Sequence, residues 1–526
     1  MNRKIVGMCV CMLVIATALP AVGTINKDIK TNIAPLQPPG VNWVKTYGGE
    51  EFNWLFDINP TDDGGYIAGG VFEYQDRMCA WMLKTNENGN ETWSAINDLW
   101  YGTSPILNEI GVQCVLQVDD GFIAGGYGLY YNSVHGYETV VGYLWKVNTA
   151  GETQWLKALA NDIDEWAVAP FGVVQVDDEL IFSGWFVQIT TYPDFFLDIA
   201  LFKTDMDGNL DLDWIHTYDA GGFDYARSIW PTTDGGYFLA GGTEEPNPFV
   251  EYGAYYMVKT DSNGVEEWNK TFDGPGDDWS GVRGCRQTDD GGYIQSGMSF
   301  SWGDGDQDAW VVKTDASGNM MWNKTYGSEN NEHCYGMDAA NMSPTEEGYV
   351  FVIVKNAWKM SEPKEDLWII ETDKEGNLEY ELQLEEDGTQ WLQGIHQIED
   401  KGFILVGRNG VLTSTDCSGV IMEIAPFPHF EIEINGGLGV NAVITNDGYG
   451  DAVNVPYKIH AKGGFLGLVN KTKTGLVNTP TGGSQNVSTG MFLGFGKISI
   501  SVKVGVKEKT ATGFVIGPFI FGVKVS

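Results

Sequence analysis

A short pattern that is repeated seven times with small changes constrains the fold of this chain more than any other feature does. Its fullest copy, residues 288–327, holds three runs in which apolar and polar side chains alternate, separated by turns rich in glycine and aspartate. This alternation is typical of β-strands joined by hairpins and differs from the spacing of a helix. Each copy has an acidic residue in the first of these turns: Asp63, Asp120, Asp178, Asp234, Asp290, Glu347 and Asp400.

The acids lie 53 to 58 residues apart, and a period of this length with four short strands is the signature of a β-propeller. We name the strands of a unit a (before the acid), b (GYIAGG-like), c (AWVVKTD-like) and d (MWNKTYG-like). The first repeat strand along the chain is a d strand at Trp43, with no a, b or c strand before it, and the last unit, 393–425, has no d strand. If the strand at Trp43 lies beside 420–424, seven blades close without an unpaired edge. The sequence therefore predicts an all-β fold with a seven-bladed, four-stranded propeller over 41–425.

The N-terminus resembles a secretory signal, with a basic start, an apolar run and small residues before an expected cleavage after Gly23. An uncleaved membrane anchor is the alternative, because the apolar run approaches the length of a membrane span. We expect residues 24–40 to be a linker and the protein to be secreted or exposed at the cell surface, without a transmembrane span once the signal is removed. Five cysteines remain, and an odd number argues against a disulfide framework.

Charge is distributed unevenly along the chain. Residues 427–526 hold nine lysines and five acids, which leaves 23 basic and 66 acidic residues, a net charge of −43, in residues 1–426. A field of this sign repels nucleic acid and anionic lipid, so neither is a plausible partner of the propeller. It favours solubility and cations.

Particular motifs in the repeats resemble those of known propellers. Glycine pairs that end strand b, such as Gly69-Gly70, upstream of a d-strand tryptophan resemble kelch repeats. The turn 260–264 followed by Trp268 resembles the tryptophan-docking repeats of quinoprotein-like propellers, although it is one residue shorter between aspartate and glycine. As a whole, the repeat is similar to those of secreted prokaryotic propellers. The resemblance covers 41–425 and implies the fold, whereas one fold hosts many activities.

A different module follows the repeats. From Pro426 onward tryptophan is absent, and alternating runs such as FEIEI and KISISVKVGV are separated by turns such as NDGYGDA. This pattern predicts an immunoglobulin-like β-sandwich over residues 426–526. The segment 437–459 resembles the adhesion-type sandwiches of prokaryotic surface proteins, which implies a spacer or adhesive role.

Residues that recur in every unit are predicted to be structural. The aspartates of the c–d turns can accept hydrogen bonds from turn amides, the d-strand tryptophans pack between blades, and the c-strand lysines bury their stems with their heads near acidic turns. These sets include Asp205, Asp261, Asp315 and Asp373; Trp43, Trp93, Trp155, Trp214, Trp268 and Trp322, with Tyr380; and Lys203, Lys259 and Lys313.

The d–a and b–c loops share one side of a propeller, which we call the loop face, and here they are long and variable. This makes the loop face the candidate working surface. The b–c loops carry aromatic residues, among them Tyr131, Trp185, Trp302 and Trp358. Exposed rings beside carboxylates are suited to bind sugars or proteins. The alternative is that these rings pack the loops against one another.

A second candidate set lies on the innermost strand. Counting seven residues back from each a–b acid gives Phe56, Gln113, Phe171, Arg227, Arg283, Ala340 and Gln393. Arg227 and Arg283 would be neighbours around the axis and could clamp a carboxylate or sulfate by bidentate hydrogen bonds. Pairing with nearby acids is the alternative, and it is favoured by the excess of acids.

A third candidate is a calcium site in the b–c loop of the fifth unit. Asp304, Asp306 and Asp308 alternate along a glycine-containing loop, and Ca²⁺ prefers several hard oxygen ligands. The loop lacks the spacing of an EF-hand, so an acidic loop without metal is the alternative. We therefore expect no cofactor, with Ca²⁺ at this loop as the alternative.

Catalytic motifs are sparse. The propeller has four histidines at unrelated positions, and there is no GxSxG or HExxH motif. The first hypothesis is thus a non-catalytic protein that binds a glycan or protein through the loop face. The second is a carbohydrate-active hydrolase or lyase that uses acids on the same face. The third is a quinoprotein-like scaffold or redox propeller, for which no cofactor-binding set can be assembled.

Overall fold

The structure is a computed structural model that describes residues 40–49, 52–74, 78–97, 107–132, 137–162, 166–189, 195–244, 253–276, 278–303, 307–327, 332–343, 346–355, 366–384, 390–409 and 417–525. Strands dominate these residues, and their one helical element is the short 3-10 helix η1(Phe465–Gly467). Within the described ranges, no helix is long and apolar enough to cross a membrane. The expected signal, 1–23, and most of the expected linker lie outside them.

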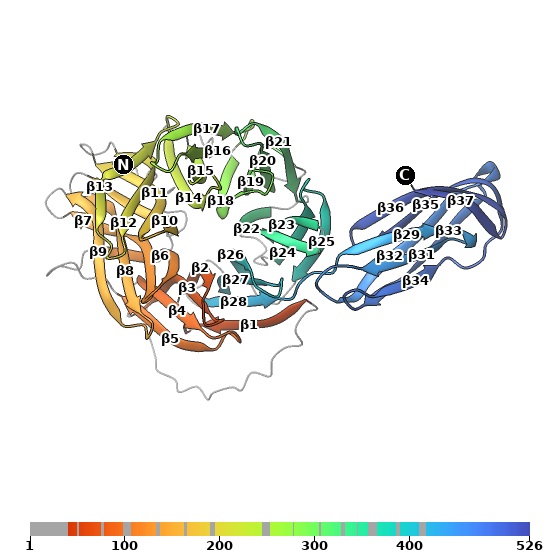
Figure 1. Ribbon diagram of the computed structural model, residues 1–526, viewed down its shortest axis with the longest axis horizontal. Helices are drawn as coiled ribbons and strands as arrows, with labels where there is room; N and C mark the ends of the chain where they lie inside the picture. Colours follow the sequence, from red (N-terminus) through yellow and green to blue (C-terminus); the bar gives the residue numbers. More distant parts are fainter. Residues whose placement is uncertain are drawn as a thin grey trace, which may run out of the picture.

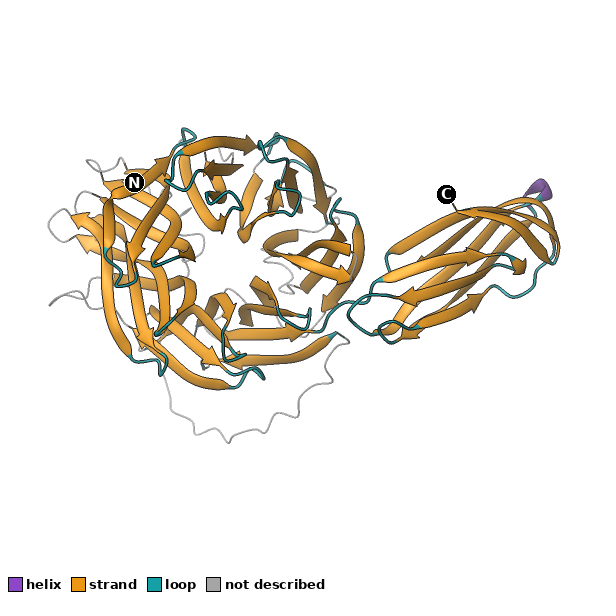
Figure 2. Ribbon diagram, in the orientation of Figure 1, coloured by secondary structure: helices purple, strands orange, loops and turns teal. Residues whose placement is uncertain are grey.

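Residues 41–424 form a ring of antiparallel sheets around a central axis, which is the arrangement of a β-propeller (Figures 1 and 2). Five sheets have four strands: β2(Asn53–Pro60), β3(Tyr66–Glu73), β4(Met78–Thr85), β5(Glu91–Asn97); β14(Phe223–Pro231), β15(Tyr237–Glu244), β16(Gly253–Thr260), β17(Glu266–Phe272); β18(Asp278–Gln287), β19(Tyr293–Ser299), β20(Asp308–Thr314), β21(Met320–Tyr326); β22(Glu332–Ser343), β23(Glu346–Lys355), β24(Asp366–Asp373), β25(Leu378–Leu384); and β26(Gln390–Gln397), β27(Phe403–Asn409), β28(Ser418–Ile424), β1(Val41–Tyr47). The prediction of an all-β chain with a propeller is confirmed.

The remaining sheet of the ring has eight strands in sequence order: β6(Leu107–Val118), β7(Gly121–Asn132), β8(Tyr137–Asn148), β9(Thr153–Asp162), β10(Trp166–Val176), β11(Glu179–Ile189), β12(Phe195–Asp205) and β13(Leu210–Tyr218). Its two halves meet at β9 and β10, where the only paired residues are Trp166 with Asp162 and Ala167 with Ala160. Each half repeats the four-strand order of the other sheets. The hydrophobic core of the ring lies mostly between neighbouring sheets, as a series of separate clusters.

The first strand closes the ring, as predicted. β1 pairs antiparallel with β28, with Trp43 opposite Glu423 and Thr46 opposite Val420 (Figure 1). The indole nitrogen of Trp43 donates a hydrogen bond of 3.0 Å to Glu423 Oε2. The edge that β28 would otherwise expose is therefore covered by the chain's own N-terminal segment.

Tryptophans of the outermost strands hold neighbouring sheets together. Five of them pack against an aromatic residue near the start of strand b of the next sheet, with ring centroids 5.3–6.4 Å apart. The pairs are Trp43–Tyr66, Trp93–Phe122, Trp214–Tyr237, Trp268–Tyr293 and Trp322–Tyr349. This confirms the prediction that these tryptophans pack between neighbouring sheets.

The tryptophans also explain why the c–d turns need glycine. The glycines Gly89, Gly151, Gly208, Gly318 and Gly376 all have positive φ, and a Cβ at any of them would lie within 3.0 Å of a tryptophan ring of the preceding repeat. At Gly264 the ring is that of His216, which follows Trp214 on β13. Tyr218 and Tyr326 donate hydrogen bonds to the carbonyls of Gly264 and Gly376. Backbone and ring thus approach more closely than any side chain would allow.

This close approach can be tested with two glycines of one sheet. Gly318 and Gly291 have φ of 76° and 80°, but only Gly318 faces a ring: its Cβ would lie 2.8 Å from Trp268, whereas Gly291 has nothing within 4 Å. We expect Gly291→Ala to cost about 1 kcal/mol because of its backbone conformation. Gly318→Ala should cost about 1–3 kcal/mol more because of overpacking. Urea unfolding of both variants measures the difference, and equal losses would show that the ring contact does not require glycine.

The recurring lysines and aspartates have the predicted roles. The c-strand lysines are largely buried, and each Nζ lies 2.7–2.9 Å from an acid in the a–b turn or, for Glu179, directly after it: Lys84–Asp63, Lys146–Asp120, Lys203–Glu179, Lys259–Asp234 and Lys313–Asp290. Partial burial alone would raise the pKa of Asp63, but hydrogen bonds from Thr61 and Lys84 lower it to about 2. At the c–d turns, Asp261 Oδ1 accepts hydrogen bonds from the amides of Asn263 and Val265.

Residues 430–525 form a second, elongated body beside the ring (Figure 1). A three-stranded sheet contains β29(Phe430–Asn435), β31(Asn441–Asn446) and β34(Ser484–Ser488). A six-stranded sheet contains β30(Gly437–Leu438), β37(Phe519–Val525), β36(Lys507–Gly517), β35(Gly494–Val504), β32(Ala452–Gly463) and β33(Val469–Thr479). Alternate residues of both sheets enter one shared core, while the residues between them face outward.

The junction between ring and second body combines apolar and charged contacts. The ring of Phe427 packs against Tyr380 and Phe403, with centroids 4.8 and 5.6 Å apart. Lys507 Nζ, on β36, lies 2.6 Å from Glu379 Oε2 on β25 and donates a hydrogen bond of 2.9 Å to His429 Nε2. Charged side chains of both bodies therefore contact one another directly at the junction.

Candidate binding site on the loop face

A pocket of about 490 Å³ opens at one end of the β14–β17 sheet. It is built from the β13–β14 turn, the facing ends of β15 and β16, and the β17–β18 turn, so it lies on the loop face. Its lining is mostly backbone and small side chains, together with Thr243, Glu244 and Asp273. This volume falls in the range typical of small-molecule sites.

An exposed tryptophan borders the pocket. Trp302 is 47% exposed, and its indole nitrogen lies 3.0 Å from the point where Gly274, in the pocket wall, would carry a Cβ. Ser301 fixes this contact, because its hydroxyl donates to Asp278 Oδ2 at 2.9 Å and accepts a hydrogen bond from the amide of Gly276. The side chain of Phe300, also exposed, lies against Gly276. An aromatic surface thus continues directly from the pocket wall.

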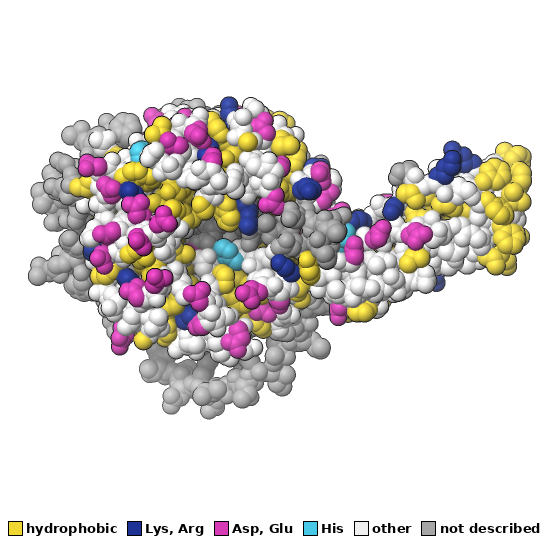
Figure 3. Space-filling model, in the orientation of Figure 1, with side chains coloured by type: hydrophobic (Ala, Val, Ile, Leu, Met, Phe, Trp, Pro, Cys, Tyr) yellow, Lys and Arg dark blue, Asp and Glu magenta, His cyan; other side chains and the backbone are white. Residues whose placement is uncertain are grey.

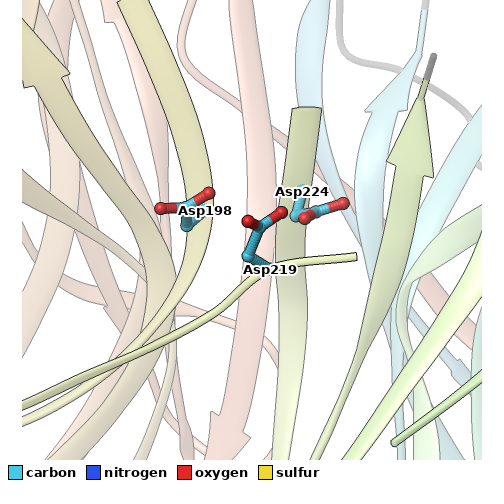
Figure 4. A group of neighbouring side chains, drawn as sticks. All are labelled: Asp198, Asp219 and Asp224. Carbon is cyan, nitrogen blue, oxygen red and sulfur yellow. The ribbon is translucent and has the colours of Figure 1, made fainter. Parts of the chain in front are cut away.

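Three carboxylates meet beside the same turn. Asp198 on β12, Asp219 after β13 and Asp224 on β14 have carboxylate oxygens within 4.8 Å of one another (Figure 4). Asp219 and Asp224 flank the β13–β14 turn and stabilise it. Asp219 accepts a hydrogen bond from the amide of Gly221, and Asp224 accepts one from the amide of Ala220. Among the residues that the structure describes, this is the group that could hold a hard divalent cation.

Burial makes this cluster unusual in so acidic a chain. Asp224 is fully buried, and its Oδ1 has no hydrogen-bond partner among the described residues. Loss of solvation, together with the charges of Asp219 and Asp198, raises the pKa of Asp224 to about 6, although hydrogen bonds from Thr243 and Ala220 act in the opposite direction. Burial and the charge of Asp219 also raise the pKa of Asp198. The buried hydroxyl of Tyr256 likewise has no described partner, and burial followed by the charge of Asp224 raises its pKa.

The raised pKa predicts a pH dependence of stability. The native state holds a proton on Asp224 more tightly than the unfolded chain, so the stability of the wild type falls as pH rises from about 4 to about 6. Asp224→Asn removes this loss. Its free energy of unfolding should exceed that of the wild type by about 1–2 kcal/mol above pH 6, and the two proteins should be nearly equal at pH 4. Urea unfolding at pH 4, 6 and 8 measures this, with the exposed Asp213→Asn as a control. An unchanged pH slope in Asp224→Asn would contradict the assignment.

The residues found by counting back from the acids lie on the innermost strands. Most of them share one structural feature, an interruption of the strand pairing. An extra residue interrupts the pairing at Phe56, Gln113, Phe171, Arg227 and Gln393. These are β-bulges, which redirect a side chain. In β22 the bulge falls at Tyr335, so the choice of Ala340 was wrong: Ala340 is regularly paired with Gly348. The pairing of β22 with β23 continues to Ser343 and Glu346, so more strand residues separate the bulge from Glu347 and the count of seven stops too early.

The arginine clamp stays a prediction. The guanidinium of Arg227 lies 5.0 Å from the ring of Tyr225, and its Nε has no hydrogen-bond partner among the described residues. Arg283 lies in β18, within the irregular stretch between Ser280 and Cys285, and its side chain is outside the description. The distance between the two guanidinium groups is therefore not defined.

Several other candidate residues lie away from an accessible surface. Trp185 is in β11 and only 6% exposed, packed against Phe171 with centroids 4.4 Å apart, so its expected place among exposed loop rings was wrong. Gln393 is fully buried, and Gln113 is half-buried on β6. Trp358 and the side chain of Tyr131 lie outside the described part of the chain. Trp302 is the predicted ring that the structure places beside the pocket.

The predicted calcium loop is described only at its end. Asp304 and Asp306 lie outside the described residues, whereas Asp308 opens β20 and is buried. Its carboxylate packs so closely against Gly303 and Gly327 that neither position has room for a Cβ. Calcium binding at this loop stays a prediction.

The carboxylate cluster and the pocket were missed from the sequence. With 71 acids in the chain, none of these three aspartates stands out until burial is known. The segment Asp219-Ala-Gly-Gly-Phe-Asp224 offered one signal, because two aspartates flank a glycine-containing turn on the loop face.

Comparisons with known proteins find no family model and no curated protein that matches the chain. Among solved structures, it is similar to Drosophila Semaphorin 2a (8% identity, TM-score 0.42, 88% of this chain and 96% of that one). It is also similar to a Trypanosoma rangeli sialidase mutant displaying trans-sialidase activity (8%, 0.40, 92% and 91%) and to Sqt1 from Chaetomium thermophilum (10%, 0.37, 76% and 96%). With TM-scores below 0.5, these likenesses carry no argument about this chain.

Proposed function

We propose that this protein is a non-catalytic binding protein that holds a glycan in the loop-face pocket beside Trp302. The observation that carries the proposal is the exposed indole next to a 490 Å³ pocket whose wall includes Glu244 and Asp273. A sugar presents an apolar C–H face and a rim of hydroxyls. The first would stack on the indole, and the second would donate hydrogen bonds to the carboxylates.

Binding is favoured over hydrolysis by the position of the acids. Glycoside hydrolysis needs two carboxyl groups on either side of the scissile bond, one of them with a raised pKa. Asp219 and Asp224 supply the close pair and the raised pKa, which is why a hydrolase is the second candidate. Asp224 is fully buried, however, so a saccharide in the pocket has no access to it.

A glycan array probed with the protein identifies the ligand, and calorimetry with Trp302→Ala tests the site. The loss of an aromatic side chain that the bound ligand covers costs at least about 2 kcal/mol of binding free energy, so we expect about thirtyfold weaker binding. Tyr74→Ala is the matched control, because this exposed ring lies at the end of strand b of another sheet and should leave affinity unchanged.

Three results would overturn the proposal. These are binding by Trp302→Ala as tight as that of the wild type, an array without any ligand while an extracellular protein binds, and cleavage of the bound glycan. Release of reducing ends, abolished by Asp219→Asn, would point to the hydrolase instead.

We also propose a finer description of the architecture. The eight-stranded sheet is two blades joined by a short contact between β9 and β10, which gives seven blades with the five four-stranded sheets. The two-sheet body is proposed to be an immunoglobulin-like spacer or adhesive module. Secretion or display at the cell surface, expected from residues 1–23, belongs to the same proposal.

A further inference from the structure

The far end of the second body exposes a concentration of large apolar side chains (Figure 3). We call it the apolar tip. It consists of Leu438, Phe465, Leu466, Leu468, Met491, Leu493, Phe495, Phe514, Ile516, Phe519 and Phe521, which are 42–82% exposed. Single exposed apolar residues are ordinary, but a contiguous group of this size on a soluble body indicates an interaction surface.

Strand pairing shows that these side chains are neighbours. Phe495 lies opposite Ile516, and Ile516 lies opposite Phe519, so three strands carry one apolar row. Phe514 lies opposite Phe521 in the next row. The turn around η1 and the loop before β35 continue the surface with Leu466, 82% exposed, and Leu493. The apolar side chains therefore occupy adjacent turns as well as the outer face of the six-stranded sheet.

Lysines border the tip, and acids are absent from it. Lys497 lies opposite Phe514, while Lys462 directly precedes the tip turn, and both are exposed. Lys524 follows one row farther on β37. The chain has no acidic residue between Asp451 and Glu508 and none after Glu508. The tip is thus an apolar end with a purely cationic border.

We propose that the apolar tip inserts into the surface of an anionic lipid bilayer. Its apolar side chains would enter the boundary between headgroups and acyl chains, while the lysines would bind the anionic headgroups. A second copy fits less well, because a two-fold contact through the tip would bring identical lysine borders together. The strongly acidic ring lies at the opposite end of the molecule, where its repulsion from the bilayer is smallest (Figure 3).

The proposal is tested with a fluorophore that reports local polarity, attached through Leu466→Cys in the full-length chain. Val453→Cys is the matched control, because Val453 is also exposed and apolar but lies at the start of β32, whose other end leads into η1 and Leu466. Wild-type protein treated with the same reagent is the blank for native thiols. A site-specific label is needed because the apolar run of residues 1–23 can itself bind vesicles.

With vesicles of phosphatidylcholine and phosphatidylserine, we expect a blue shift of the label at position 466 and none at position 453. Binding to phosphatidylcholine alone should be weaker by about tenfold or more, since each lysine near an anionic surface contributes about 1 kcal/mol. Lys462→Glu, Lys497→Glu and Lys524→Glu together should remove this preference, and Leu493→Ser should weaken binding by about tenfold.

Two results overturn the proposal. One is a label at position 466 that stays as hydrated as the label at position 453 while the protein sediments with vesicles. The other is a blue shift that requires no lipid and grows with protein concentration, which would assign the tip to self-association.

Discussion

Glu371→Gln is expected to stabilise the protein at alkaline pH by about 3–5 kcal/mol. Glu371 is fully buried, and loss of solvation followed by the charge of Glu379 raises its pKa to about 8, while Lys507 acts in the opposite direction. The folded protein holds this proton where the unfolded chain releases it near pH 4.5. The stability of the wild type therefore falls as pH rises from about 4.5 to about 8, and the loss is complete above pH 8.

The position of Glu371 explains this unusual burial. It precedes Thr372 on strand c, where the corresponding residue of other sheets is a lysine such as Lys259 or Lys313. Those lysines pair with acids of their own sheets. Here the repeat has an acid, and the nearby cation, Lys507, comes from the second body. The variant removes the buried ionisable group and keeps its shape.

Urea unfolding at pH 5, 7 and 9 measures the effect. The difference between Glu371→Gln and wild type should be below about 1 kcal/mol at pH 5, larger at pH 7 and complete at pH 9. The exposed Glu375→Gln, in the adjoining turn, should follow the wild type at each pH. A variant that unfolds in parallel with the wild type at all three values would show that Glu371 is already charged in the folded protein.

Arg408→Ala is expected to destabilise the ring by about 3–5 kcal/mol. The side chain of Arg408 is fully buried on β27, with its guanidinium 4.8 Å from the ring of Trp54 and 5.0 Å from that of Trp391. The two indoles belong to neighbouring sheets and are 5.9 Å apart. The truncation removes two desolvated cation–π contacts and leaves a cavity between them.

Two further variants separate charge from volume. Arg408→Met keeps much of the volume without the charge, whereas Arg408→Lys keeps the charge without a plane that stacks on indole. If cation–π contact dominates, Arg408→Lys retains more stability than Arg408→Met in urea unfolding. If packing dominates, Arg408→Met approaches the wild type, and the predicted role of the charge is wrong.

Closure of the ring was predictable because the two incomplete units at the ends of the repeat complement each other. The first strand must then complete the last unit, and Trp43 does pair with Glu423. The inner-strand positions were predictable wherever the a–b turn keeps its length, as at Arg227. They were not predictable in β22, where a longer paired hairpin places the bulge at Tyr335, farther from the acid of the turn.

The candidate site was largely unpredictable. Its pocket is walled by backbone of Gly221, Gly274 and Gly276, whose spacing depends on how neighbouring sheets pack and leaves no pattern in the sequence. Trp302 could be found because a large ring in a variable loop is conspicuous. Asp224 could not, since only its burial distinguishes it from other acids.

Closure by β1 also sets the order in which the chain can fold. Trp43 and Glu423 are 380 positions apart, and synthesis proceeds at about 5–20 residues per second, so the first strand waits about 20–80 s for its partner. During that time it is an unpaired, aromatic segment, and contacts of such long range are the slowest to form. The ring can close only after its last strand, β28, has been made, and until then the first strand needs protection from pairing with other chains.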